Sequence, residues 1–146
     1  AGDEVKTMDY FNLGRAYYSA AQADTVMETK VELFKKADNA FAVVAERAPE
    51  DYRGNMWRAR SHSGMDPETE LGLAKPFYEK VVEMLEAKGD KSNTIIEAYQ
   101  YLGYYNYLKE YAENPQGAKY IETRKWWGKI LEINPEHSIK EAMSQL

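Results

Sequence analysis

The sequence predicts an all-α fold of about seven helices. Apolar residues recur three and four positions apart along stretches rich in Ala, Glu, Lys, Leu, Met and Tyr, and this spacing puts them on one side of a helix. Proline and glycine are confined to a few places between these stretches, where they indicate turns. The chain has 146 residues, a length that suits one domain with its own core. We therefore expect a single helical domain over residues 1–146.

Start signals precede most of the expected helices. In a capping box, a hydroxyl and a carboxylate three residues later bind the free amides of the first turn, and an Asp or Asn followed by proline is a second start signal. The capping boxes are Thr25 to Glu28, Thr94 to Glu97 and Ser138 to Glu141, and the proline starts are Asp66-Pro67 and Asn114-Pro115. The helices are expected near 6–23, 25–47, 51–63, 67–87, 92–110, 115–133 and 137–145.

Proline and glycine also predict where helices end. The stop signals are Ala48-Pro49, Lys88-Gly89 and Asn134-Pro135. Pro76 falls inside the fourth expected helix, where an interior proline costs about 3 kcal/mol or more, and Gly72 lies just before it. We therefore expect this helix to begin near Leu73, with Pro76 in or near its first turn and residues 67–72 in a separate turn or a kinked lead-in.

Composition and charge exclude several classes of protein. There are 24 acidic and 19 basic residues, a net charge of −5 that argues against a general binder of nucleic acid or of anionic membranes. Cysteine is absent, which excludes disulfides, thiolate metal sites and thiol catalysis. No apolar run approaches the roughly 18–20 residues that span a bilayer, and the first residues do not resemble a signal peptide. We expect a soluble domain without membrane insertion, and the sequence indicates no compartment.

An internal repeat groups the helices into pairs. Small residues recur at spacings of 45 and 44 on the first, third and fifth helices, at Gly14, Ala59 and Gly103. On the following helices a small residue precedes an aromatic residue by four positions, at Ala37 and Phe41, Ala74 and Tyr78, and Thr123 and Trp127. A small residue lets two helices approach closely, while the aromatic rings fill the gap between neighbouring helix hairpins. We expect six aromatic side chains in the core: Tyr10, Tyr17, Phe41, Tyr78, Tyr99 and Trp127.

This pattern resembles the tetratricopeptide repeat (TPR) family, whose pattern is Trp-x2-Leu-Gly-x2-Tyr, then Ala-x3-Phe, then Pro. The first unit matches best, through Tyr10, Leu13, Gly14, Tyr17, Ala37, Phe41 and Pro49. The third unit keeps Tyr99, Leu102, Gly103, Trp127 and Pro135, and the second matches least. A period near 44 also falls in the range of HEAT and armadillo repeats, but the combined Leu-Gly and Ala-x3-Phe pattern is that of the TPR family.

The resemblance implies a right-handed α-solenoid of three divergent TPR helix pairs. The units would cover about 7–50, 51–88 and 92–135, and residues 137–145 would form a terminal capping helix. A TPR unit has 34 residues, so the longer period requires extra length between paired helices, chiefly near 20–30 and 112–119. Whether this extra length covers a binding groove is open.

Catalytic and metal sites find little support in the sequence. The two histidines, His62 and His137, are far apart, and neither has a second ligand type at the spacing of a zinc site. Phosphate-binding and nucleophile motifs are absent from the sequence. The acidic residues Glu79, Glu83 and Glu86 share one helix side with lysines, which is typical of a solvated surface. We therefore expect no enzyme activity, no catalytic residue, no cofactor and no metal.

In TPR proteins the first helix of each pair lines a concave groove, so the resemblance implies which side chains face it. These are Met8, Phe11, Arg15 and Tyr18 in the first unit, Arg53, Met56, Arg60 and Ser63 in the second, and Glu97, Gln100, Tyr104 and Tyr107 in the third. Arg, Tyr, Met and Phe are enriched at binding surfaces. We expect partner contacts from Phe11, Arg15, Tyr18, Arg53, Met56, Arg60, Gln100, Tyr104 and Tyr107.

Three of these residues are arginines in an acidic protein, which favours a partner with an acidic segment. The alternative is that Arg15, Arg53 and Arg60 pair with acidic residues of the chain itself, such as Glu97. The chaperone-binding subset of the family uses a Lys/Asn/Arg clamp for a terminal carboxylate. That clamp is absent, because its positions hold Phe11, Arg15, Trp57, Glu97 and Tyr101.

The functional hypothesis is a non-catalytic module that binds a protein or peptide within a larger assembly or chain. Two alternatives stay open. Tyr104 and Tyr107 belong to a tyrosine-rich helix and could stack on sugar rings, which keeps glycan or small-ligand binding in the same groove as an alternative. A self-association scaffold, with exposed tryptophans or end helices packed between copies, is the other.

Overall fold

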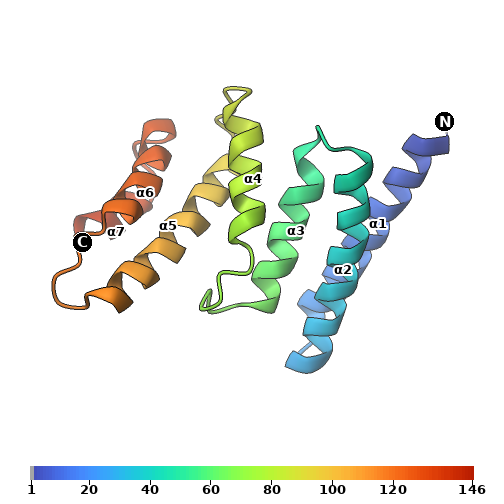
Figure 1. Cartoon of the computed structure of the whole chain (residues 1–146), viewed down its shortest axis with the longest axis horizontal. Helices are drawn as coiled ribbons and strands as arrows, with labels where there is room; N and C mark the ends of the chain where they lie inside the picture. The colour runs from blue at the N-terminus through green and yellow to red at the C-terminus, as the bar shows by residue number, and fades with distance from the viewer. Residues whose placement is uncertain (1) are drawn as a thin grey trace. The chain divides into compact units, whose positions relative to one another are not determined.

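The computed structural model describes residues 2–146, with the side chains of residue 2 and residues 5–146. Within this range it contains seven α-helices and no strand (Figure 1). They are α1 (Gly2–Ala23), α2 (Met27–Arg47), α3 (Tyr52–Met65), α4 (Lys75–Glu86), α5 (Asn93–Glu113), α6 (Ile121–Ile133) and α7 (Ile139–Ser144). The predicted all-α class is confirmed.

The chain divides into two compact units, Ala1–Met84 and Leu85–Leu146, hereafter unit 1 and unit 2. Unit 1 holds α1, α2, α3 and most of α4, and unit 2 holds α5, α6 and α7. In unit 1, α1 packs against α2 and α2 against α3, whereas in unit 2 α5 packs against α6 and α6 against α7. The organisation as one domain of three repeats, and the handedness of the solenoid, stay predictions.

The glycine and aromatic positions of the repeat meet in each of the two hairpins. In unit 1, a Cβ atom placed on Gly14 of α1 would lie 2.6 Å from the ring of Phe41 on α2. In unit 2, a Cβ atom on Gly103 of α5 would collide with the indole of Trp127 on α6. Phe41 and Trp127 are buried. Each ring therefore packs against the glycine of its own hairpin, whereas the sequence predicted rings that fill the gap between hairpins.

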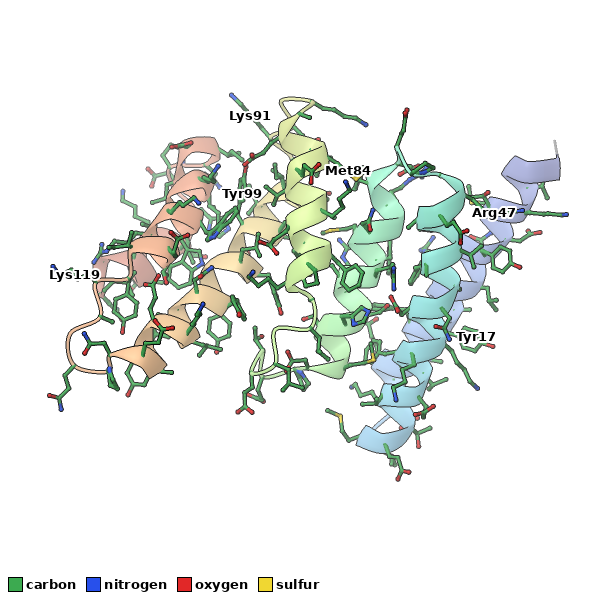
Figure 2. All side chains as sticks on the ribbon, in the orientation of Figure 1. Tyr17, Arg47, Met84, Lys91, Tyr99 and Lys119 are labelled. Atoms are coloured by element: carbon green, nitrogen blue, oxygen red, sulfur yellow. The ribbon has the colours of Figure 1, made fainter. Side chains whose placement is uncertain are left out.

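Other aromatic residues follow the prediction less closely. Tyr78 and Tyr99 are buried, as expected. Tyr17 is half-buried, and the prediction for Tyr10 is wrong, because 39% of its surface is exposed. Tyr17 and Arg47 project from the α1–α2 hairpin (Figure 2), and the Arg47 guanidinium carbon lies 6.0 Å from the Tyr10 ring centre.

Pro76 lies in the first turn of α4, which begins at Lys75, so the predicted late start of this helix is confirmed to within two residues. The segment before it is organised by Asp66, which ends α3 and is buried. Its carboxylate accepts hydrogen bonds from the backbone amides of Leu71 (3.2 Å) and Leu73 (3.3 Å). Asp66 thus closes a loop and does not start a helix, so the expected start at Asp66-Pro67 is wrong.

The predicted capping boxes do not form. The residues before α2, α5 and α7 are Val26, Ser92 and Ser138, and none of their side chains caps a helix. Near each helix start, a backbone amide donates a hydrogen bond to the side chain two residues before it. The amide of Val26 donates to Asp24 (2.8 Å), that of Ser92 to Asp90 (2.8 Å) and that of Ile139 to His137 (3.0 Å). These contacts satisfy amides at or just before the helix starts, not the Glu28, Glu97 and Glu141 amides of the expected capping boxes.

Three further boundaries differ from the prediction. α1 begins at Gly2, four residues before the expected start. α5 continues to Glu113, so Asn114 ends this helix where the sequence predicted the start of the next one. α6 begins only at Ile121, after Tyr120 in the left-handed conformation (φ 53°). The extra length near 112–119 is thus largely a loop, whereas that near 20–30 lies mostly in the ends of α1 and α2.

The predicted helix ends before Pro49, Gly89 and Pro135 are confirmed. α2 ends at Arg47 before Pro49, and α6 ends at Ile133 before Pro135. Gly89 follows α4 with φ 66°, and the amide of Asp90 donates to the carbonyl of Leu85 at 3.0 Å, a turn that satisfies a helix-end carbonyl. None of the described helices combines the length and apolar character needed to cross a membrane.

Candidate functional site

Aromatic rings from α1 and α3 meet on one side of unit 1. Trp57 of α3 contacts Phe11 with ring centres 6.0 Å apart and Tyr18 with centres 5.1 Å apart. Both pairs are edge-to-face, with planes at 87° and 88°. In an edge-to-face pair, the edge of one ring contacts one face of the other ring, and the remaining ring faces stay uncovered. These faces attract cations, because an aromatic face carries negative charge density.

Three guanidinium groups lie over these rings. Arg15 lies 5.9 Å from the centre of Phe11 and 5.8 Å from that of Trp57. Arg53 lies 5.9 Å from Phe11, and Arg60 lies 4.8 Å from Trp57. The three arginines that the sequence assigned to one groove are therefore neighbours in unit 1. We call these residues the arginine–aromatic cluster: Phe11, Arg15, Tyr18, Arg53, Trp57 and Arg60.

The arginines of the cluster differ in how they are held. Arg53 binds the Asp51 carboxylate through Nε at 3.0 Å and Nη2 at 2.6 Å, and these bonds raise the pKa of its guanidinium. Arg15 is exposed, and among the described residues it forms no ion pair. The alternative of internal pairing thus holds for Arg53 but not for Arg15.

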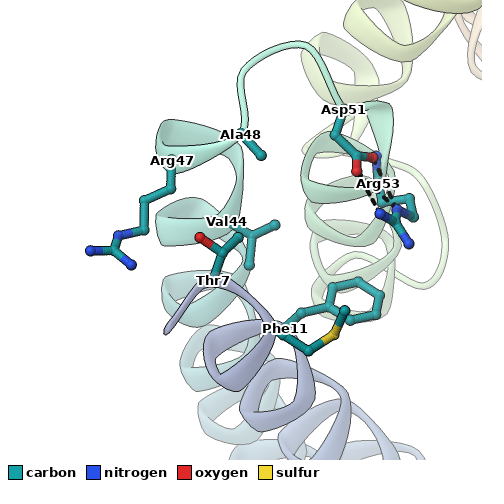
Figure 3. Close-up of a pocket in the computed structure, with 8 residues that line it drawn as sticks. Thr7, Phe11, Val44, Arg47, Ala48, Asp51 and Arg53 are labelled. Carbon is teal, nitrogen blue, oxygen red and sulfur yellow. Dashed lines mark hydrogen bonds and ion pairs between the residues drawn. The ribbon is translucent and has the colours of Figure 1, made fainter. Parts of the chain in front are cut away.

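A cavity of about 600 Å³ adjoins the cluster (Figure 3). Its lining comes from three helices and one loop: Thr7, Met8 and Phe11 of α1, Val44 and Arg47 of α2, Ala48 and Asp51 of the following loop, and Arg53 of α3. Sequence reasoning found Met8, Phe11 and Arg53 and missed the rest. The repeat pattern assigns only the first helix of each pair to the groove, so it gives no signal for the end of α2.

Trp57 was also missed as a member of the cluster. It is half-buried and contacts Phe41 of the core as well as Phe11 and Tyr18. Its position, four residues after Arg53 and three before Arg60, gives it the same side of α3. That spacing was the available signal.

Met56 does not belong to the accessible surface. Only 1% of its surface is exposed, and it lies in the core with Ala59. The expected contact between Met56 and a partner is therefore wrong, because α3 buries Gly54, Met56, Ala59 and Ser61, a wider arc than one groove face would leave. We leave Met56 out of the binding surface.

The predicted residues of the third unit form a different arrangement in unit 2. Tyr107 stacks nearly parallel to four neighbouring rings, with centres 5.3–6.5 Å apart and planes at 17–21°: Tyr104, Tyr111, Tyr120 and Trp127. We call this set the tyrosine stack. Tyr104 is 43% exposed and Tyr107 is half-buried. Gln100 is exposed, and its backbone carbonyl accepts a hydrogen bond from the Trp127 indole at 3.3 Å.

Parallel stacking limits what the tyrosine stack offers a ligand. A ring inside a stack has its faces covered by neighbouring rings and presents its edge and hydroxyl group. A sugar ring needs an open face, which leaves the outer rings Tyr104 and Tyr111, the latter 51% exposed. Tyr120, whose ring also belongs to the stack, has a left-handed backbone with φ 53°, which the sequence did not indicate.

His62 has a structural environment. Its Nε2 lies 3.1 Å from Asp38 Oδ2, and its ring stacks on Phe77 with centres 4.5 Å apart. Arg58 binds the other Asp38 oxygen at 2.8 Å. Burial raises the pKa of Asp38, but the close contact with His62 and the hydrogen bonds from Arg58 outweigh it, so the pKa lies below its usual value. Asp38 is thus held as a carboxylate in an ion-pair network.

A second network joins the end of α4 to α5 and α6 within unit 2. Tyr99, marked in Figure 2, donates its hydroxyl hydrogen to Glu86 Oε1 at 2.7 Å, and Lys129 Nζ lies 2.9 Å from the same oxygen. Burial raises the pKa of Glu86, but the hydrogen bonds from Tyr99 and Lys129 lower it by more, so the net shift of this pKa is downward. Burial and then Glu86 raise the pKa of Tyr99. No group of three metal-ligating side chains occurs among the described residues.

Comparison with known proteins supports a TPR-like fold. No protein-family model matches the sequence, and no curated protein matches it. A solved structure does match: the C-terminal part of a TPR repeat-containing protein from Cytophaga hutchinsonii, with a TM-score of 0.67 and 31% sequence identity. The fold is TPR-like. The match covers 86% of this chain and 45% of the chain in that structure, so the present chain spans less than half of its length.

Proposed function

We propose that this chain is a non-catalytic protein-binding module that holds a partner segment on the arginine–aromatic cluster of unit 1. The observation that carries the proposal is the gathering of Arg15, Arg53 and Arg60 around the rings of Phe11 and Trp57. Tryptophan, tyrosine and arginine dominate the binding energy of protein interfaces. The TPR-like fold supports the same class of function.

The cluster suits a partner with an acidic segment. Its guanidinium groups supply charge and paired hydrogen-bond donors for carboxylates. The rings beneath them hold the arginines in place before binding, which reduces the loss of side-chain entropy on association. Tyr18 of the same surface adds further contact area. In unit 2, taken by itself, Gln100, Tyr104 and Tyr107 stay separate proposed contact residues. An acidic chain with net charge −5 gives no comparable support for binding nucleic acid.

A pull-down from native cell extract tests the proposal. The purified wild type is compared with Arg15→Glu and with the matched control Lys91→Glu, an exposed lysine of unit 2 marked in Figure 2. Captured proteins are identified by mass spectrometry and then purified for direct titration. We expect a protein that binds the wild type and Lys91→Glu and that loses at least about tenfold in affinity for Arg15→Glu.

Other outcomes would contradict the proposal. Equal binding by all three proteins would move the interface away from the cluster. Self-association would appear as a rise in weight-average mass with concentration in analytical ultracentrifugation. Glycan binding at Tyr104 and Tyr111 would appear as a rise in melting temperature with sugars that Tyr104→Ala abolishes.

A further inference from the structure

Two equivalent positions of the repeat differ in exposure between the units. They lie four residues and one residue before the glycine that contacts the core ring. In unit 2 they hold Tyr99 and Leu102 of α5, which are 5% and 1% exposed. In unit 1 they hold Tyr10 and Leu13 of α1, which are 39% and 45% exposed. The side of α1 that corresponds to a buried side of α5 is therefore open to a partner.

Unit 2 shows how a carboxylate fits against this side of the first helix. The hydroxyl group of Tyr99 donates a hydrogen bond to Glu86 Oε1 at 2.7 Å, and Lys129 Nζ lies 2.9 Å from the same oxygen. Lys129 Nζ also lies 5.6 Å from the centre of the Tyr99 ring. Glu86 is the last residue of α4, and Leu85 before it is buried. A helix end with leucine and glutamate therefore lies where a tyrosine and a cation meet.

Unit 1 contains the same pair of tyrosine and cation. The guanidinium carbon of Arg47 lies 6.0 Å from the centre of the Tyr10 ring, and Arg47 belongs to the second helix of its hairpin, as Lys129 does. The two cations occupy different positions along their helices, so the similarity is one of geometry. Tyr10 and Arg47 are exposed, and among the described residues neither is bound by a carboxylate. Figure 3 shows the Arg47 side chain extending away from the cavity.

A second cation lies on the same side of α1. Lys36 Nζ lies 5.8 Å from the centre of the Tyr17 ring, and Lys36 is exposed. Leu13 lies three residues after Tyr10 and four before Tyr17, which puts the three side chains on one helix side. The combination of exposed apolar area with two cations favours a partner that carries an apolar side chain beside a carboxylate. We call these residues the outer face: Tyr10, Leu13, Tyr17, Lys36 and Arg47.

The charged residues Lys6 and Asp9 mark the edge of the outer face. Both are exposed, whereas their counterparts in α5, Ile95 and Ala98, are buried. An apolar partner surface over Lys6 and Asp9 would remove two charges from water, which costs free energy. We therefore expect apolar contact over Leu13 and the two tyrosines, and not over the first turns of α1.

We propose that the outer face of unit 1 binds an α-helix of a partner protein whose last turn carries a leucine followed by a glutamate. The glutamate binds the Tyr10 hydroxyl group and the Arg47 guanidinium group, as Glu86 binds Tyr99 and Lys129 in unit 2. The leucine covers Leu13. None of the residues of the outer face belongs to the arginine–aromatic cluster, so this inference goes beyond the proposed function and does not depend on it.

The test uses a peptide with the sequence of residues 75–90, because this segment carries Glu86 and makes the corresponding contact in unit 2. A lactam between Lys75 and Glu79, which form an ion pair at 3.4 Å in the folded chain, holds the peptide in a helix, and circular dichroism verifies the helix. The peptide is titrated to millimolar concentration into the isotope-labelled full chain, and amide chemical shifts locate the site. We expect the largest shifts in residues 10–17 and near Lys36 and Arg47.

Two leucine variants test the apolar part of the contact. Leu13→Asp should weaken peptide binding about tenfold or more, because the outer face loses its apolar side chain. Leu71→Asp is the matched control with unchanged affinity, since Leu71 is an exposed leucine of unit 1 outside the outer face. Both substitutions are at exposed positions, and circular dichroism checks that each variant folds.

A double-mutant cycle tests the carboxylate. The peptide with Glu86→Gln should bind the wild type about two- to fivefold more weakly, which is the upper range for an exposed ion pair. Against Arg47→Gln, the two peptides should bind nearly equally, because both changes remove the same contact. Lys35→Gln, at an exposed lysine of the same helix, should preserve the full difference between the peptides.

Three results would overturn the inference. They are shifts confined to α3 or α5, equal binding by wild type and Leu13→Asp, and absence of binding by the helical peptide. A Glu86→Gln effect that persists in Arg47→Gln would also overturn it, since the carboxylate would then bind elsewhere. Each of these results would leave the proposed function intact, because Leu13→Asp and Arg47→Gln do not change the arginine–aromatic cluster.

Discussion

The two units use their aromatic side chains in different ways. In unit 1, Trp57 meets Phe11 and Tyr18 edge-to-face, and arginines cover the open ring faces. In unit 2, the ring of Tyr107 stacks nearly parallel to the rings of Tyr104 and Tyr120, so its neighbours are aromatic rings and not arginines. Both arrangements sit beside the same contact of a glycine with a large ring. The two units therefore share a core contact between a glycine and a large ring. The residues around that contact determine whether arginine or tyrosine side chains lie beside it.

The largest expected effect tests whether the two core rings are equivalent. Phe41→Ala in unit 1 and Trp127→Ala in unit 2 should each lower the free energy of unfolding by about 3–5 kcal/mol, because each removes a buried ring and leaves a cavity. Urea unfolding followed by circular dichroism measures both. A loss below about 1 kcal/mol in either variant would break the equivalence.

The next effect concerns the buried carboxylate of unit 1. Asp38→Asn should cost about 1–3 kcal/mol at neutral pH, because it leaves Arg58 and His62 with a weaker partner. The folded-state pKa of Asp38 is lowered, so its contribution is present above the unfolded pKa and is lost as pH falls through the folded pKa. The difference between wild type and variant should narrow below about pH 4. A difference that stays constant from pH 7 to pH 3 would argue against this assignment.

Three glycine substitutions sharpen the comparison of the hairpins. Gly14→Ala and Gly103→Ala gain up to about 1 kcal/mol of helix propensity but force a ring aside at about 1–3 kcal/mol, so both should destabilise by about 1 kcal/mol on balance. Gly128 of α6 has no atom within 4 Å of an added Cβ, and Gly128→Ala should stabilise by about 0.5–1 kcal/mol. Thermal melting compares the three variants. Stabilisation by Gly103→Ala would show that Trp127 can move without loss.

The smallest effect is expected at the exposed network of unit 2. Glu86 is exposed, so water screens its bonds to Tyr99 and Lys129, and Glu86→Gln should cost about 0.2–1 kcal/mol. Its lowered pKa has the same sign as that of Asp38, and its contribution should also be lost at acidic pH. Urea unfolding at pH 7 compares it with Asp38→Asn. An effect as large as that of Asp38→Asn would mean that exposure does not separate the two networks.

Part of the candidate site could be read from the sequence because it follows from spacing along a helix. Phe11, Arg15 and Tyr18 lie three and four positions apart on α1, and Arg53 and Arg60 lie seven apart on α3, which puts each set on one helix side. The same rule failed for Met56, because burial depends on what packs against a helix. The cavity residues at the end of α2 carry no periodic signal, since they meet α1 and α3 only in the folded unit.

The sequence by itself determined the all-α class, most helix ends, the late start of α4 and the burial of Phe41 and Trp127. These features depend on local sterics and on spacing within one or two helices, which the order of residues encodes directly. Only the tertiary structure decided the starts of α1 and α6, the exposure of Tyr10, the burial of Met56 and the pairing of Arg53 with Asp51. Each of these depends on which groups lie nearby in the folded chain, and spacing along one helix does not encode that.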